Sequence, residues 1–125
     1  MNGNELWWND MPVKNRCNDG HREIIESILI EYTKIPYAYG DIQTEAVFDR
    51  QRDRYLLVNT GWDQGRRVHG CLVHVDMIDG KSWIQRDATE YGIAQELLDA
   101  GVPKDRIVLA FRSLEMRRLT AFAVT

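Results

Sequence analysis

The order of apolar and polar residues predicts a helix near the start of the chain. Between residues 21 and 34, apolar side chains recur at the spacing of one helix face. They are Ile24, Ile25, Ile28, Leu29 and Tyr32. Pro36 prevents the helix from continuing, because proline lacks the N–H that the helix ladder needs. Residues 1–20 show no such pattern and are punctuated by Asn, Asp and Gly. We therefore expect an irregular N-terminal arm over 1–20, in which Trp7 and Trp8 are the only large apolar pair.

Four strands are predicted next, at about residues 42–48, 55–62, 67–77 and 81–86. The segments between them are short and polar. The last connection is Asp79-Gly80, a preferred pair for a two-residue type I′ hairpin turn. Short connections join antiparallel strands, so the four strands should form an antiparallel meander.

A second helix should cover about residues 90–100, with Thr89 as its N-cap and Gly101 at its end. A short apolar strand is expected at 107–111, and the tail from residue 113 should hold a helical turn and an extended end. The predicted fold class is α+β, with one domain over 21–125. In order, it has an N-terminal helix, a four-stranded antiparallel meander, a second helix and a short late strand, and the helices cover one face of the sheet.

The Asp79-Gly80 turn also predicts which side chains share a face. It pairs Ile78 with Lys81 and, four steps further out, His74 with Gln85. One face then carries the apolar residues Cys71, Val73, Val75, Met77 and Ile84. The opposite face carries Leu72, His74, Asp76, Trp83 and Gln85.

A polar sheet face with an embedded tryptophan suits contact with a partner. We expect Arg66 and Arg67 to flank it and Trp83 to anchor the contact. The candidate partner-binding residues are Arg66, Arg67, His74, Asp76, Trp83 and Gln85. The competing interpretation is that Trp83 lies under a helix and fills the core.

Composition and charge narrow the class of protein. The chain has 44% hydrophobic and 28% charged residues, as in ordinary soluble domains. No apolar run approaches the roughly 20 residues of a membrane span, and the first ten residues do not resemble a signal peptide, so a cytoplasmic protein is expected. The net charge of −3 argues against strong nonspecific DNA binding, which depends on neutralising phosphates.

The sequence offers little for catalysis or cofactors. His74 and Asp76 share a face, but no nucleophile is expected there, because Cys71 should point the other way. His69 and Cys71 share a face but lack further metal ligands at recognisable spacing. Neither a GxxxxGK[ST] loop nor a GxGxxG run is present. We therefore expect no catalytic residues, no metal and no cofactor.

Arginine supplies twelve of the sixteen cations and occurs in three clusters. These are Arg50, Arg52 and Arg54; Arg66 and Arg67; and Arg112, Arg117 and Arg118. If the clusters converge in space, they would meet phosphate or an acidic partner. Charged turns are also ordinary solvated surface, and nearby aspartates partly cancel the first two clusters. Direct DNA binding therefore stays an alternative.

Several motifs in one collinear order resemble the XisI family over about residues 21–125. They are EYTKIPYA (31–38), GW (61–62), RRVHGC (66–71), HVD (74–76), GKSWIQRD (80–87), TEYGIA (89–94), GVPKDRIVL (101–109) and FAV (122–124). The arm over residues 1–20 falls outside the resemblance.

The resemblance implies an accessory role in the excision of a DNA element in cyanobacteria. In that system XisI acts with a companion, XisH, alongside a site-specific recombinase that cuts and rejoins the DNA. XisH-type proteins resemble nucleases, so an antitoxin-like or immunity-like inhibitor is one alternative, and a direct DNA-binding factor is another. A hydrolase that uses His74 and Asp76 is a more distant one. Self-association of the chain stays open, and the family offers no catalytic residues to carry over.

Overall fold

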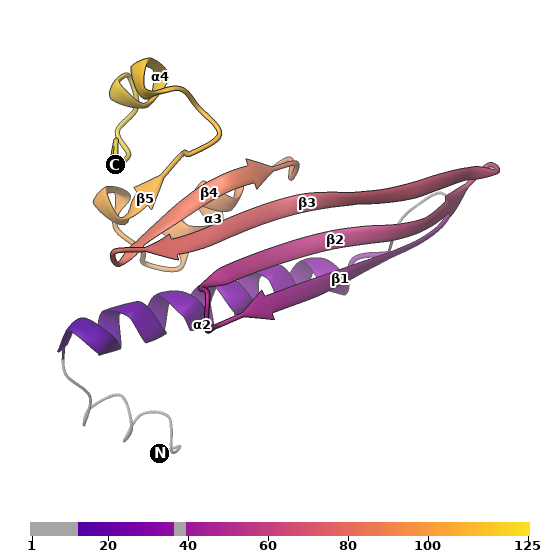
Figure 1. Cartoon of the computed structure of the whole chain (residues 1–125), viewed down its shortest axis with the longest axis horizontal. Coiled ribbons are helices and arrows are strands. Elements are labelled where there is room, and N and C mark those ends of the chain that lie inside the picture. Colours follow the sequence, from indigo (N-terminus) through magenta and orange to yellow (C-terminus); the bar gives the residue numbers. More distant parts are fainter. Residues whose placement is uncertain (1–12, 37–39) are drawn as a thin grey trace.

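The computed structural model describes residues 13–36 and 40–125 of the chain (Figure 1). Its elements are α2 (Val13–Thr33), β1 (Asp41–Asp49), β2 (Arg54–Asp63), β3 (Arg66–Ile78), β4 (Lys81–Asp87), α3 (Ile93–Asp99), the 3-10 turn η1 (Lys104–Arg106), β5 (Ile107–Val108) and α4 (Leu114–Arg118). This arrangement confirms the predicted α+β class, the order of elements and the helical turn in the tail.

The sheet has five strands in the order β1-β2-β3-β4-β5. The first four form the predicted antiparallel meander, and β5 pairs with β4 in parallel. The late strand is two residues long, shorter than the predicted 107–111. The N–H groups of Ala110 and Arg112 bond within the segment, to the carbonyls of Val108 and Leu109, which interrupts the ladder, although the N–H of Phe111 still donates to the carbonyl of Ile84 in β4.

The predicted irregular arm is wrong for residues 13–20, which form the first turns of α2. These residues carry no apolar stripe, so periodicity did not reveal them. Gly20 and its polar neighbours are weak helix formers, but each costs only about 1 kcal/mol or less. Extending an existing helix gains one hydrogen bond per residue, which offsets that cost. Trp7 and Trp8 lie outside the described residues.

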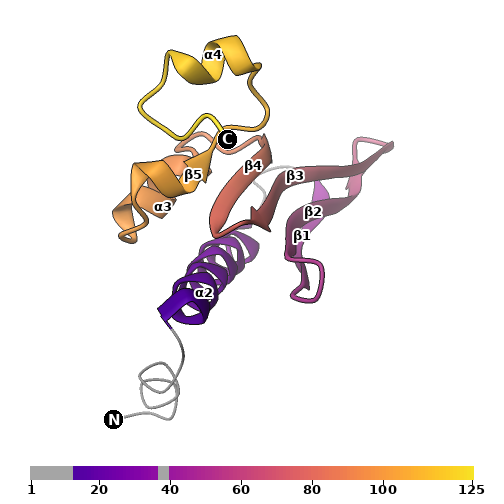
Figure 2. The ribbon, with the colours of Figure 1, turned by 60° about the vertical axis from the view of Figure 1, so that its left-hand side comes forward.

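The core lies between one face of the sheet and the helices α2 and α3. Its largest fully buried side chains include Tyr55, Leu57, Val73, Val75 and Ile84 from the sheet and Ile25, Leu29, Ile93 and Leu97 from the helices. Figure 2 shows α2 below the strands and α4 above them. One sheet face is therefore covered by α2 and α3, as predicted, and the other face is not covered by these two helices.

The start of α3 differs from the prediction. The helix begins at Ile93 with Gly92 as its N-cap, not after Thr89. Asp87, at the end of β4, takes over the capping role: its carboxylate accepts hydrogen bonds from the N–H of Ile93 at 2.7 Å and from the hydroxyl of Thr89 at 2.5 Å. The carboxylate thus fixes the turn between the sheet and α3.

Candidate functional site

The sheet face that points away from α2 and α3 is called the open face here. Antiparallel partners that lie directly opposite each other point to the same side, so the strand registers define it. The open face includes Asp41, Glu45, Val47 and Asp49 of β1, Arg54, Leu56 and Val58 of β2, Cys71, His74 and Asp76 of β3, and Trp83, Gln85 and Arg86 of β4.

Asp76 lies at the centre of a polar cluster on the open face. Nε2 of His74 lies 2.8 Å from its Oδ1, and Nε2 of Gln85 donates to its Oδ2 at 3.4 Å. The guanidinium of Arg54 approaches the same carboxylate at 4.0 Å. The Asp76 side chain is only 15% exposed, and these neighbours surround its carboxylate. Three of the predicted residues, His74, Asp76 and Gln85, are therefore in contact.

Arg54 is a member of this cluster that the sequence analysis did not place there. The register sets Arg54 opposite Asp76 from β2, and Trp83 opposite Asp76 from β4. The β3–β4 turn fixed only the second of these pairs. Placing Arg54 requires the β2–β3 register, which depends on the Gln64-Gly65 turn and on an irregularity between the two strands.

Two irregularities change the predicted faces. The pairing of His74 with Gln85 is wrong: His74 lies opposite Arg86, because the β3–β4 register shifts between His74 and Val75. Gln85 is the extra residue and still reaches Asp76 on the open face. The pairs Ile78–Lys81, Met77–Ser82, Asp76–Trp83 and Val75–Ile84 are confirmed.

The second irregularity exchanges the predicted positions of Cys71 and Leu72. The β2–β3 register shifts between Leu57 and Val58, so that Cys71 lies opposite Val58 and shares the open face. Leu72 packs against the core instead. A bulge inserts one residue and moves every later side chain to the other face. The expectation that Cys71 points to the core and Leu72 away from it is therefore wrong.

An apolar strip crosses the open face beside the polar cluster. Val47 of β1 lies opposite Leu56 of β2, and Leu56 lies opposite His74. Val47 is 46% exposed, and Leu56 and Val58 are half-buried. The sequence carried a signal for this strip, because Tyr55-Leu56-Leu57-Val58 is apolar at every position and so places apolar side chains on both faces.

Trp83 lies at the border between the open face and the C-terminal segment. Its indole is half-buried, and the guanidinium of Arg117, from α4, lies 5.7 Å from its ring centroid. Its Nε1 is buried and finds no hydrogen-bond partner among the described residues. Trp83 is thus covered in part by α4 and not by α2 or α3, and its role as a partner anchor stays a prediction.

Arg66 and Arg67 do not flank the polar cluster. They begin β3 at the tip of the β2–β3 hairpin, which extends past the end of α2 (Figure 1). His74 lies seven positions along the strand from Arg67, a distance of about 23 Å. Arg67 instead stacks on Trp62, with its guanidinium 5.3 Å from the ring centroid. These two arginines therefore belong to a separate surface at the hairpin tip.

The first and second arginine clusters do not converge, whereas Arg117 of the third lies over Trp83, which lies opposite the same Asp76 as Arg54 does. Arg50, Arg52 and Arg54 lie at one end of β2, and Arg66 and Arg67 lie beyond its other end. Ten strand residues, about 30 Å, separate the two groups. Arg50 forms a two-pronged ion pair with Glu26, and Arg52 pairs with Asp49. The structure thus divides the cations among separate regions and pairs two of them with carboxylates.

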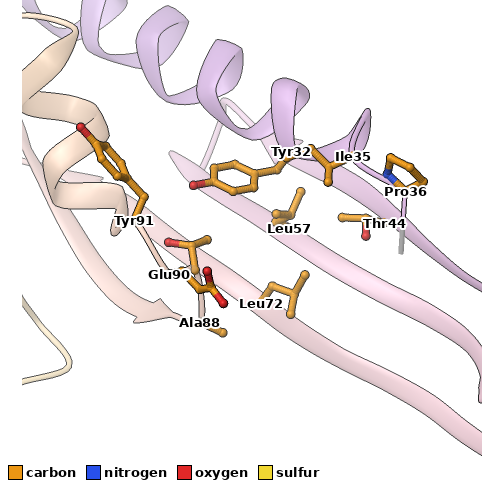
Figure 3. Close-up of a pocket in the computed structure, with 10 residues that line it drawn as sticks. Tyr32, Ile35, Pro36, Thr44, Leu57, Leu72, Ala88, Glu90 and Tyr91 are labelled. Carbon is orange, nitrogen blue, oxygen red and sulfur yellow. The ribbon is translucent and has the colours of Figure 1, made fainter. Parts of the chain in front are cut away.

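A groove of about 480 Å³ lies on the helical side of the sheet, between the end of α2 and the segment before α3 (Figure 3). Its lining includes Tyr32, Ile35, Leu57, Leu72 and Tyr91. Burial raises the pKa of the Tyr32 hydroxyl, which keeps it neutral. The lining is apolar except for a few hydroxyls and Glu90, and the sequence analysis did not predict this groove.

Across residues 20–36 and 40–125, whose side chains the structure describes, no cluster of three or more His, Cys, Asp or Glu side chains is arranged to hold a metal ion. His74 and Asp76 form the only predicted acid–base pair, and the thiol of Cys71 on the same face is directed to the carbonyl of Val73 at 3.2 Å.

None of the helices in the described ranges is both long and apolar enough to cross a membrane.

Comparison with known proteins gives consistent results. The family model described as XisI protein matches residues 17–124. A crystal structure of a XisI-like protein from Anabaena variabilis ATCC 29413 is 30% identical, with a TM-score of 0.78, and the match covers 85% of this chain and 97% of that one. The fdxN element excision controlling factor XisI from the same organism is 32% identical, with a TM-score of 0.74 and coverage of 87% and 99%. No curated protein matches the chain. The chain therefore belongs to the XisI family.

Proposed function

We propose that this protein is a non-enzymatic controlling factor that acts by binding a partner protein on its open face. The partner is a XisH-type, nuclease-like chain, and the process is the excision of a DNA element by a site-specific recombinase. Family membership supports the regulatory role, since the similar crystal structure is described as an excision controlling factor. The surface itself supports the binding mode.

The observation that carries the proposal is the apolar strip on the open face. An antiparallel sheet often has one face in water, but such a face normally carries polar side chains. Here Val47, Leu56 and Val58 lie side by side without α2 or α3 above them. Adjoining exposed apolar side chains, rimmed by polar ones, mark protein interaction sites. The strip therefore supports binding of another protein chain.

The polar cluster beside the strip supplies specificity. His74, Gln85 and Arg54 hold the Asp76 carboxylate in place before a partner arrives. A preorganised cluster loses little conformational entropy on binding. Asp76 and His74 still have free lone pairs and protons that a complementary partner can satisfy. A mismatched partner would leave them buried and unpaired, at a cost of about 1–3 kcal/mol for each group.

Trp83 and Arg117 extend this surface towards the C-terminal segment. Tryptophan and arginine are enriched among residues that dominate binding energy, and here they are already stacked. Direct DNA binding receives less support, because Arg66 and Arg67 lie far from the cluster of Arg50, Arg52 and Arg54, and two of the arginines are paired with carboxylates.

Calorimetric titration of a purified XisH-type partner tests the proposal with a matched pair of variants. Val47→Lys places a charge on the apolar strip, and Ile30→Lys makes the same change at a similarly exposed residue of α2. We expect Val47→Lys to weaken binding at least tenfold and Ile30→Lys to change it less than twofold. Equal affinity of both variants and the unaltered chain would show that the open face does not bind the partner.

Trp83→Ala separates the two interpretations of Trp83. If Trp83 anchors the partner, the variant keeps its unfolding midpoint but loses about 2 kcal/mol of binding free energy, roughly thirtyfold in affinity. If Trp83 mainly fills space under Arg117, the variant's free energy of unfolding falls by about 3 kcal/mol or more. A folded variant with unchanged affinity would exclude the anchor.

A further inference from the structure

The two edges of the sheet differ in the length of the edge strand and in what covers it. At one edge, β5 is two residues long and the C-terminal tail lies along it: Val108 forms a parallel bridge with Ala123, whose N–H donates to the carbonyl of Ile107 at 2.9 Å. At the other edge, β1 pairs with β2 over nine consecutive residues without a bulge. One edge is therefore short and covered, whereas the other is long and regular.

The register shows which backbone groups of β1 point outward. The two-residue loop Gln64-Gly65 makes Asp63–Arg66 a hydrogen-bonded pair. Because backbone N–H and C=O groups alternate in direction along a strand, those of odd-numbered residues in β2 bond to β3 and those of even-numbered residues bond to β1. Even residues of β2 lie opposite odd residues of β1, as Leu56 does opposite Val47. The outward N–H and C=O groups of β1 therefore belong to Ile42, Thr44, Ala46 and Phe48.

Within the part of the chain that the structure describes, no hydrogen bond occupies these outward groups. The backbone hydrogen bonds of the turns and loops in residues 13–36 and 40–125 do not reach any of the four residues. Edge strands usually carry charged side chains, especially lysine, or a proline or a bulge that prevents pairing with another chain. The sequence of β1, DIQTEAVFD, contains neither lysine nor proline, its pairing with β2 has no register shift, and its charged residues are all carboxylates.

The charges of β1 decide what can pair with this edge. Asp41, Glu45 and Asp49 recur every fourth residue and point to the open face, and β1 has no cation. Antiparallel pairing of two copies through all four outward residues would place Glu45 opposite Glu45 and Asp41 opposite Asp49. Like charges in directly opposed positions are destabilising. A second copy of this chain is therefore a poor occupant in that register.

We propose that the free edge of β1 binds an extended segment of another protein that carries lysine or arginine at every fourth position. The segment would join the sheet as a sixth strand. Its main chain would bond to the outward groups of Ile42, Thr44, Ala46 and Phe48. Two of its cations would meet Asp41 and Glu45, and the third would share the Asp49 carboxylate with Arg52. Main-chain bonds supply affinity in this mode of recognition, and side chains supply specificity. The edge adjoins the open face, to which its carboxylates point, but this binding does not require the partner proposed there.

A synthetic peptide tests the edge directly. The probe is Lys-Thr-Val-Thr-Lys-Thr-Val-Thr-Lys, and the control peptide has Glu in place of each Lys. Backbone amide resonances of the full chain are followed by NMR during titration to millimolar peptide. We expect shifts at the four outward amides of β1, weaker binding at high salt because the ion pairs are screened, and at least tenfold weaker binding of the Glu peptide.

Three variants complete the test. Ala46→Pro removes an outward N–H without removing a bond to β2, and it should abolish binding, whereas Ala46→Val keeps the donor and should bind within twofold of the unaltered chain. Glu45→Lys should weaken binding of the Lys peptide about tenfold and improve that of the Glu peptide. Absence of shifts at the four amides, equal binding of both peptides, or self-association of the unaltered chain through these amides would overturn the proposal.

Discussion

Gly61 shows how a single residue permits the β1–β2 pairing. A Cβ atom built at this position would lie 2.0 Å from the carbonyl oxygen of Asp41 and 2.6 Å from Cα of Ile42. Both are backbone atoms, so a larger residue forces β1 and β2 apart. Only glycine fits this close approach.

Gly61→Ala should therefore lower the free energy of unfolding by at least about 2 kcal/mol, measured by urea denaturation. Gly70→Ala is the matched control, because a Cβ there meets only the Asn59 side chain at an ordinary 3.6 Å. Its effect should stay within about 0.5 kcal/mol. Equal losses for the two variants would contradict this account of the close approach.

His21 makes the docking of α2 sensitive to acid. Its side chain is only 6% exposed, and its Nδ1 has no hydrogen-bond partner in the described part of the chain. Burial, and then the charge of Arg106, hold the pKa of His21 below its ordinary value of 6.5. Folding therefore favours neutral His21, whereas the unfolded chain binds a proton more readily.

The sign of the pH effect follows from that difference. The contribution of neutral His21 is complete above pH 6.5, and it declines as the pH falls from there towards the lower pKa of the folded state. The unfolding midpoint should fall between pH 7 and 5, and less steeply in His21→Gln, which cannot titrate. Parallel pH profiles for the two proteins would show that His21 does not contribute.

The C-terminal segment depends on Arg117 as an organising group. Its guanidinium donates to the carbonyls of Leu109, Ala110, Arg112 and Val124 and lies over the ring of Trp83. A planar guanidinium presents several donors in fixed directions, whereas the lysine ammonium is a single charged point. Arg117 thus ties α4 and the tail to the border of the open face.

Arg117→Lys should loosen this segment without unfolding the core. We expect faster hydrogen exchange at the amide of Ala123, which bonds to Ile107, and a red shift of the tryptophan fluorescence as Trp83 becomes more exposed. Arg118→Lys, at the neighbouring exposed position, is the control and should change neither. Unaltered exchange at Ala123 in Arg117→Lys would refute the organising role.

At the scale of elements, the sequence predicted most strands and turns because the Asp79-Gly80 loop and the alternation of β4 are local. The prediction failed where pairing with a strand distant in sequence determines the register. The shift that exchanges Cys71 and Leu72 depends on how β3 meets β2, and periodicity within β3 does not contain that information. The start of α2 was missed for a related reason, because residues 13–20 lack an apolar stripe.

The candidate site was also predicted only in part. His74, Asp76, Trp83 and Gln85 were assigned to one face from the turn alone, and the structure places them there. Arg54 and the apolar strip were missed because they come from β1 and β2, whose registers are set by other turns. Arg66 and Arg67 were misplaced because nearness to β3 in sequence does not give the length of the hairpin.

For the whole molecule, the net charge of −3 and the pairing of Arg50 and Arg52 with carboxylates predict weak interaction with DNA. In a gel shift at physiological salt, the isolated chain should leave duplex DNA unbound at micromolar concentration. Sequence-specific binding in the nanomolar range would reverse this prediction, and Arg66 and Arg67 would then be the first residues to replace.

NMR saturation transfer from a protonated XisH-type partner to the methyl groups of the labelled chain tests the central claim most directly. It shows which methyl groups lie at the interface. We predict transfer to Val47, Leu56 and Val58 on the open face, and none to Ile30, which is 42% exposed on α2. Transfer to Ile30 without transfer to the three open-face residues would contradict the claim that the open face binds the partner.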